Sequence, residues 1–152
     1  MKDCVFCKIS KGKIPVNKIW EDENHIAFLS NKPNTKGFTV VITKKHFSSY
    51  AFNLSDSVLS ELVIASKKVA LLLDKKLEDV GRTGLILEGF GVDHVHSKLF
   101  PMHGTKNMKG WQPIHSNINK YFKKYERYIS SHDCRFADNK ELELLAKQIR
   151  SE

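Results

Sequence analysis

The chain has 152 residues, with 25 Lys and Arg against 17 Asp and Glu, so its net charge is +8. This length suits one domain, and 41% hydrophobic with 28% charged residues supply a core, which excludes a disordered or fibrous chain. No apolar run is long enough to span a membrane, and the N-terminus has no apolar signal segment, so we expect a soluble, cytoplasmic protein.

Three cysteines are an odd number, which fits a reducing compartment better than a framework of disulfides. Two of them, Cys4 and Cys7, form a Cys-x-x-Cys pair, which belongs to a metal site or a redox site, or is a coincidence of spacing. A thioredoxin-like pair follows a strand and opens a helix, whereas this pair lies at the N-terminus ahead of Gly12 and Pro15. We therefore favour half of a metal site, which needs two further ligands.

The first part of the chain predicts a β-hairpin, a turn and a buried strand. Residues 18–29 (KIWEDENHIAFL) have two apolar patches around a polar centre, which is typical of a hairpin. Residues 31–37 (NKPNTKG) have the composition of a turn. Residues 38–43 (FTVVIT) are rich in β-branched side chains and predict a buried strand, with Lys45 and His46 following it.

A long amphipathic helix and two strands follow. After Ser55, which is a good N-cap, apolar residues recur every three or four positions and predict a helix of about five turns. The helix should end within residues 74–81. Residues 83–87 predict a strand, which the segment 88–91 (EGFG) breaks. Residues 93–100 (DHVHSKLF) alternate in character and predict the next strand.

The C-terminal third predicts a loop and two helices. Pro101 should end the last strand, and residues 102–113 carry Gly and Pro without periodicity. Aromatic and apolar side chains at helical spacing indicate a helix over residues 118–129. Asp138, with Glu141 three residues later, resembles a capping box that opens a terminal helix. This order of elements predicts an α+β domain whose antiparallel sheet is covered by helices.

The side chains of His94, His96 and Lys98 are the most informative feature of the sequence. On a strand they share one face, about 7 Å from one to the next. Each would carry a desolvation penalty in an apolar core, so the alternative to a functional role is a solvated strand edge. A neutral imidazole ligates a metal or attacks an electrophile, and lysine binds phosphate. The row therefore predicts an anion or metal site.

A resemblance to a known family rests on ordered motifs that run in register from the N-terminus to Pro101. The motifs are CVFCKI from Cys4, IP from Ile14, WED from Trp20, AFL from Ala27, VVI from Val40, KH from Lys45 and HVH from His94. The chain thereby resembles the histidine triad (HIT) family of nucleotide hydrolases and transferases. The resemblance implies a HIT-like antiparallel sheet packed with helices over residues 1–105, and a C-terminal helical extension over residues 106–152 packed on the same domain.

The resemblance implies a reaction centre on His96. The family pattern is a row of three histidines, and its middle histidine, which matches His96, attacks the α-phosphorus of a nucleotide. An imidazole suits this role because the nucleotidyl-imidazole that it forms is readily hydrolysed. Lys98 stands in place of the third histidine, and Phe38 in place of a histidine that usually begins the preceding strand. We interpret the two replacements as one coordinated change, and Lys98 as a catalytic residue that keeps a cation for phosphate.

Further residues are implied to bind the substrate. Backbone amides of the Glu-Gly-Phe-Gly segment would stabilise charge on phosphate oxygens. A serine with an asparagine beside it occupies the position of the family's ribose-binding acid, where they would bind hydroxyl groups more weakly than a carboxylate does. A histidine just after the predicted strand, near loop lysines, is a further candidate. These substrate-binding candidates are Ser30, Asn31, Glu88, Gly89, Gly91 and His103.

The resemblance also completes a metal site. Family members with an N-terminal Cys-x-x-Cys bind zinc through that pair and two histidines, and the matching histidines are His46 and His94. The implied cofactor is a structural zinc held by Cys4, Cys7, His46 and His94, a set typical of closed structural sites. Such an ion would orient the neighbouring His96 through His94 without activating water. Without a metal, the two cysteines would be buried or free thiols.

The leading hypothesis for function is a hydrolase that cleaves a dinucleoside polyphosphate or a nucleoside phosphoramidate to a nucleoside monophosphate, through a His96-bound intermediate. The alternative is a nucleotide-binding protein whose turnover was weakened or lost through the changes at Phe38 and Lys98. A third class, an enzyme that processes nucleic-acid ends, is disfavoured because the lysines are dispersed and no added zinc finger is present. The resemblance further implies a homodimer, and the short apolar runs predict no membrane partner.

Overall fold

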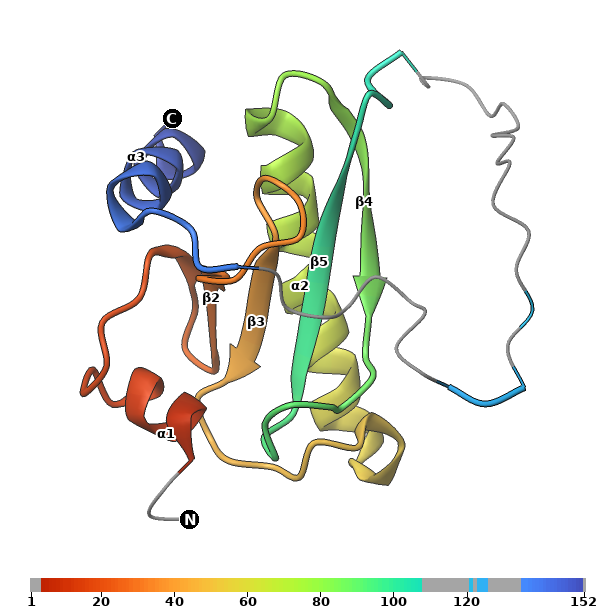
Figure 1. Cartoon of the computed structure of the whole chain (residues 1–152). Coiled ribbons are helices and arrows are strands. Elements are labelled where there is room, and N and C mark those ends of the chain that lie inside the picture. Colours follow the sequence, from red (N-terminus) through yellow and green to blue (C-terminus); the bar gives the residue numbers. More distant parts are fainter. Residues whose placement is uncertain (1–3, 108–120, 122, 126–134, 152) are drawn as a thin grey trace.

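The computed structural model describes residues 4–107, 121, 123–125 and 135–151 (Figure 1). Its elements in chain order are α1 (Val5–Ser10), β1 (Lys18–Glu21), β2 (His25–Leu29), β3 (Thr39–Thr43), a 3-10 turn (Ala51–Asn53), α2 (Asp56–Lys76), β4 (Val80–Ile86), β5 (His96–His103) and α3 (Asn139–Arg150). The five strands form one antiparallel sheet in the order β1-β2-β3-β5-β4. The predicted α+β class, with helices on an antiparallel sheet, is confirmed.

The first three strands confirm the predicted hairpin and buried strand. β1 and β2 pair over residues 18–28, and β2 pairs with β3 along its whole length. Every residue of β2 and β3 is buried because both faces of these strands are covered. One face joins a cluster beneath α2, and the other joins a smaller cluster beside α1. The members of the smaller cluster are Ile9, Ile26, Phe28, Phe38, Val40 and Ile42.

The helix predicted after Ser55 is α2, which ends at Lys76 as expected. It crosses the back of the sheet in Figure 1. Its buried face includes Ser66, whose hydroxyl lies 2.7 Å from the carbonyl oxygen of Leu62 and 2.7 Å from the hydroxyl of Ser97 on β5. The polar group is therefore satisfied inside the core, and it links the helix to the strand that carries His96.

The terminal helix α3 begins as predicted. The Asp138 side chain accepts hydrogen bonds from the backbone N–H groups of Lys140 and Glu141. The apolar face of α3 joins the cluster beneath α2 through Leu142, Leu145, Ala146 and Ile149. The helix predicted over residues 118–129 lies largely outside the described residues. No helix of the described chain combines the length and the apolar character needed to cross a bilayer.

The bounds of β4 and β5 differ from the prediction. β5 begins at His96, so His94 precedes the strand, and β5 runs through Pro101 instead of ending before it. Pairing with β3 stops at Leu99, so Pro101 has a neighbouring strand on one side only, where a missing N–H is tolerated. β4 begins three residues early, with a register shift at Gly81, where a Cβ would lie 2.3 Å from the Thr105 carbonyl oxygen.

Candidate functional site

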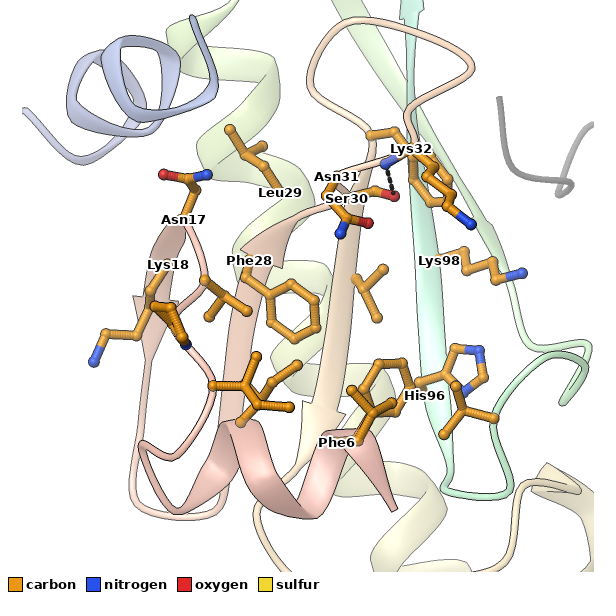
Figure 2. Close-up of a pocket in the computed structure, with 18 of the residues that line it drawn as sticks. Phe6, Asn17, Lys18, Phe28, Leu29, Ser30, Asn31, Lys32, His96 and Lys98 are labelled. Carbon is orange, nitrogen blue, oxygen red and sulfur yellow. Dashed lines mark hydrogen bonds between the residues drawn. The ribbon is translucent and has the colours of Figure 1, made fainter. Parts of the chain in front are cut away.

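A cavity of about 810 Å³ lies on the face of the sheet opposite α2 (Figure 2). Its floor is apolar and comes from α1, the hairpin and β3, with Phe6 and Phe28 near the centre. His96 and Lys98 border it on β5, and Ser30 lies at the end of β2. A volume of this size, with an apolar floor bordered by polar and charged side chains, is typical of small-molecule sites.

His96 reaches the cavity as a neutral ring with a defined tautomer. Its Nδ1 donates a hydrogen bond to the backbone carbonyl oxygen of His94, 2.7 Å away, so the lone pair is on Nε2. Within the described residues, Nε2 has no hydrogen-bond partner. Burial lowers the pKa of His96, and the charge of Lys98 lowers it further, because both disfavour the imidazolium. A neutral imidazole with a free Nε2 is a nucleophile.

Lys98 lines the cavity two residues after His96 and forms an ion pair with Glu88. The two side chains are 13% and 11% exposed. Of the predicted Glu-Gly-Phe-Gly segment, Phe90 and Gly91 line the cavity, whereas Glu88 and Gly89 are not among its lining residues. Glu88 therefore meets the cavity through Lys98.

Ser30 and Asn31, two of the predicted substrate-binding residues, line the same cavity as His96. The Ser30 side chain is anchored because its Oγ accepts a hydrogen bond of 3.2 Å from the backbone N–H of Lys32 (Figure 2). The Asn31 carbonyl oxygen accepts a hydrogen bond from the Ala137 N–H, which brings the start of α3 to this edge. Two groups that bind hydroxyls thus share one apolar cavity with the imidazole.

His103 lies apart from these residues. It is the last residue of β5 and does not line the cavity. Its Nδ1 donates to the carboxylate of Asp79 at 2.9 Å, and its Nε2 donates to the backbone carbonyl oxygen of Lys36 at 2.8 Å. The hydrogen bond to Lys36, together with Asp79, raises the pKa of His103. Both ring nitrogens are therefore engaged in joining the end of β5 to the two loops that contain Asp79 and Lys36.

The four predicted metal ligands converge. The Sγ atom of Cys4 lies 3.4 Å from Nδ1 of His94, and the Sγ atom of Cys7 lies 3.4 Å from Nδ1 of His46 and 3.5 Å from that of His94. All four ligand atoms lie within 4.8 Å of one another. A tetrahedral zinc with ordinary bond lengths separates sulfur and nitrogen ligands by about 3.6 Å. The cluster therefore fits zinc.

His94 is oriented for this cluster by the backbone of β3. Its Nε2 donates a hydrogen bond of 2.8 Å to the Thr43 carbonyl oxygen, so the lone pair on Nδ1 faces the two thiols. Burial lowers the pKa of His94, which keeps the ring neutral. Burial and the neighbouring Cys4 raise the pKa of Cys7, since neither favours a thiolate. A bound cation would supply the missing positive charge.

Helix α1 is the local element that the sequence analysis missed. Cys4 is its N-cap, with Sγ 3.5 Å from the N–H of Cys7, so the pair does open a helix. Gly12, with a φ of 69°, follows the helix end and is a C-terminal signal that the sequence contains. Phe6 of α1 packs edge-on against the rings of both His94 and His96, with centroids 5.8 and 5.2 Å away. The helix thus joins the cluster to the cavity.

The far end of the cavity is built by residues that sequence reasoning did not single out. Asn139, Glu143 and Arg150 of α3 line it, and Asn17 donates a hydrogen bond of 3.0 Å to the side-chain oxygen of Asn139. No local pattern could reveal this wall, because the contacts join residues more than a hundred positions apart.

Comparison with known proteins agrees with this geometry. The chain is similar to an uncharacterized HIT-like protein of Methanocaldococcus jannaschii, with 36% identity over 104 residues that cover 66% of this chain and 79% of that protein. It is similar to an adenosine 5'-monophosphoramidase of Candida albicans, with 31% identity over 134 residues that cover 82% of this chain and 88% of that protein. A solved structure of a hypothetical histidine triad nucleotide-binding protein from Sulfolobus tokodaii matches with a TM-score of 0.70 and 27% identity, covering 97% of this chain and 89% of the other. A family model for the HIT domain matches residues 11–105, more than half of the chain, which therefore belongs to the HIT family.

Proposed function

We propose that the chain is a nucleotide hydrolase that releases a nucleoside monophosphate through a covalent intermediate on His96. The observation that carries the proposal is the free Nε2 of a neutral, buried imidazole at the edge of a cavity of nucleotide size. Yeast relatives named adenosine 5'-monophosphoramidase support hydrolysis of a nucleotide in general. The proposed substrates are nucleoside phosphoramidates and dinucleoside polyphosphates.

The proposed reaction has two displacements at the α-phosphorus. Nε2 of His96 attacks, a bond from nitrogen to phosphorus forms, and the P–N or P–O bond to the leaving group breaks, with its electron pair staying on the departing atom. A departing nitrogen takes up a proton from solvent water, and a departing phosphate leaves as an anion. Water then attacks the same phosphorus and gives its proton to the solvent, a bond from oxygen to phosphorus forms, and the bond to His96 breaks with its electron pair returning to Nε2. The carbonyl oxygen of His94 holds the ring through both steps, since Nδ1–H continues to donate to it while positive charge develops.

Other residues of the cavity take supporting roles in this proposal. Lys98, in place of the third histidine of the family pattern, would bind a nonbridging or departing oxygen, and the Gly91 backbone would line the phosphate. Ser30 and Asn31 would bind ribose hydroxyls. His103 is left out because Asp79 and the Lys36 backbone occupy both of its ring nitrogens. The homodimer implied by the resemblance and the cytoplasmic location expected from the composition stay predictions.

We further propose that Cys4, Cys7, His46 and His94 hold one structural zinc. The donor set and the distances between its atoms support this. The ion would supply positive charge to two thiolates and fix α1 against the segment that precedes β5. Its effect on His96 would come through position alone, because His94 presents its backbone oxygen to Nδ1 of His96 and its own Nδ1 to the thiols.

The test is turnover of a diadenosine polyphosphate and of an adenosine phosphoramidate by wild type and by His96→Ala. We expect AMP release by wild type from at least one substrate and none above background from the variant. Thermal melting and binding of AMP serve as controls for folding of the variant. Equal inactivity of both proteins on both substrates, with AMP still bound, would favour the alternative of a nucleotide-binding protein without turnover.

A further inference from the structure

An ion pair borders the cavity where a site for phosphate needs positive charge. Lys98 and Glu88 are both nearly buried. Lys98 is on β5, and Glu88 follows the end of β4, two residues after Ile86, which is opposite Lys98. A buried ion pair adds little net stability, since the desolvation cost offsets the attraction. The fold alone therefore gives no reason to keep a carboxylate at this place.

The carboxylate of Glu88 is held in position from two sides. One oxygen pairs with Lys98, and the other accepts a hydrogen bond of 3.4 Å from the hydroxyl of Tyr125. The Tyr125 ring stacks on Phe90, with centroids 5.8 Å apart and an angle of 19° between the planes. Phe90 also lines the cavity, so the carboxylate is fixed relative to its wall.

The carboxylate of Glu88 lies one ion pair away from the wall of the cavity. Lys98 lines the cavity on the same strand as His96 and pairs with Glu88. Any group that leaves from phosphorus beside Lys98 therefore departs close to both charges of the pair.

We propose that Glu88 selects the leaving group by favouring the departure of an amine over the departure of a phosphate. This inference rests on the hydrolase function proposed above and narrows its substrate class to phosphoramidates. When a P–N bond breaks, the departing nitrogen keeps the electron pair of the bond and takes up a proton from solvent water, so that it leaves as a neutral or cationic amine, which a nearby carboxylate stabilises. When a P–O–P bond breaks, the departing phosphate is an anion with more than one charge, which the same carboxylate repels.

Lys98 serves both kinds of leaving group, because its ammonium donates a hydrogen bond to a departing nitrogen or oxygen. Glu88 decides how much positive charge Lys98 presents to the cavity. It is a positioning residue, since it acts through Lys98 and does not line the cavity itself.

The experiment compares kcat/KM for an adenosine phosphoramidate of a primary amine and for diadenosine triphosphate in wild type, Glu88→Gln and Glu88→Asp. The ratio of the two values should fall at least about tenfold in Glu88→Gln, because one close charge is removed. Glu88→Asp should restore most of the ratio. The matched control is Glu61→Gln, which removes the same charge from an exposed position of α2 on the other face of the sheet and should leave the ratio unchanged.

Two results would overturn the proposal. The first is an equal loss of kcat/KM on both substrates in Glu88→Gln, which would assign Glu88 a purely structural role. The second is no change of kcat/KM on either substrate, which would leave Glu88 without a role in the reaction. If wild type turns over neither substrate, the hydrolase function fails and binding becomes the readout. Glu88→Gln should then improve the affinity for ADP relative to AMP by several-fold, since ADP places a second phosphate beside the pair, and an unchanged relative affinity would overturn the inference.

Discussion

His94 and His96 are two residues apart, yet their rings leave different nitrogens available, because a different ring nitrogen of each donates to a backbone carbonyl oxygen. His94 donates from Nε2 to the Thr43 carbonyl oxygen and turns Nδ1 toward two thiols. His96 donates from Nδ1 to the His94 carbonyl oxygen and leaves Nε2 toward the cavity. The cluster of Cys4, Cys7, His46 and His94 and the cavity thus share one short segment. For these two residues of the same type, the backbone acceptor of the ring N–H decides which ring nitrogen keeps its lone pair available.

The substitution His96→Asn tests whether the cavity can be changed without changing the cluster. The cavity should lose its nucleophile, so kcat should fall by about 10³-fold or more, while AMP still binds. The cluster should be unaffected, so metal content and melting temperature should stay close to those of wild type. Single-turnover assays and calorimetry measure the two effects. A variant that retains more than a tenth of the wild-type kcat would remove His96 from the nucleophile role.

Removal of the metal addresses the other side of the comparison. If free zinc is 1,000-fold above its Kd, binding stabilises the fold by about 4 kcal/mol, so a strong chelator should lower the melting temperature by about 10 °C. Cys4→Ser should lower the temperature similarly and leave less than one zinc per chain in elemental analysis. Full zinc retained in Cys4→Ser, or a purified wild type with little zinc, would contradict the four-ligand site.

The double substitution Phe38→His and Lys98→His tests whether these two residues support turnover or have weakened it. Phe38 is buried and stacks on Phe100, with ring centroids 4.5 Å apart, and Lys98 pairs with Glu88. Both contacts would be lost, so we expect kcat/KM to fall by about tenfold and the fold to lose about 1–3 kcal/mol through the buried imidazole. A gain of activity would instead show that the present residues had weakened an ancestral enzyme.

His103 differs from His94 and His96, because both of its ring nitrogens donate hydrogen bonds. The raised pKa of His103 means that the folded state holds its proton more tightly than the unfolded state. The stabilisation is complete below the unfolded pKa of about 6.5 and is lost as the pH rises through the folded value. Wild type should therefore melt about 1–2 °C above His103→Gln at pH 5.5 and at nearly the same temperature at pH 9. A constant difference across this range would contradict the assignment.

Local patterns predicted much of the fold. The hairpin, the strand predicted over residues 38–43, the helix after Ser55 and the Asp138 cap are set by neighbours in sequence. The structure confirms these elements, with the strand beginning at Thr39. The prediction that Pro101 ends the last strand was wrong. The effect of a proline depends on which strands pair beside it, and pairing with β3 has already ended at Leu99. Helix α1 was not predicted, because its six residues are too few to show a periodic pattern of apolar side chains.

The side chains proposed for chemistry are recognisable in the sequence by their type and spacing: the Cys-x-x-Cys pair, the two histidines of the His-Val-His segment and Lys98. Which of these side chains lie in the cysteine and histidine cluster and which lie at the cavity depends on the tertiary structure. Ring tautomers follow from carbonyl oxygens of β3 and of His94 itself, and the partner of Lys98 follows from the pairing of β4 with β5. The physical reason is that hydrogen bonds and ion pairs act over a few ångströms in space, whereas a sequence records only separation along the chain.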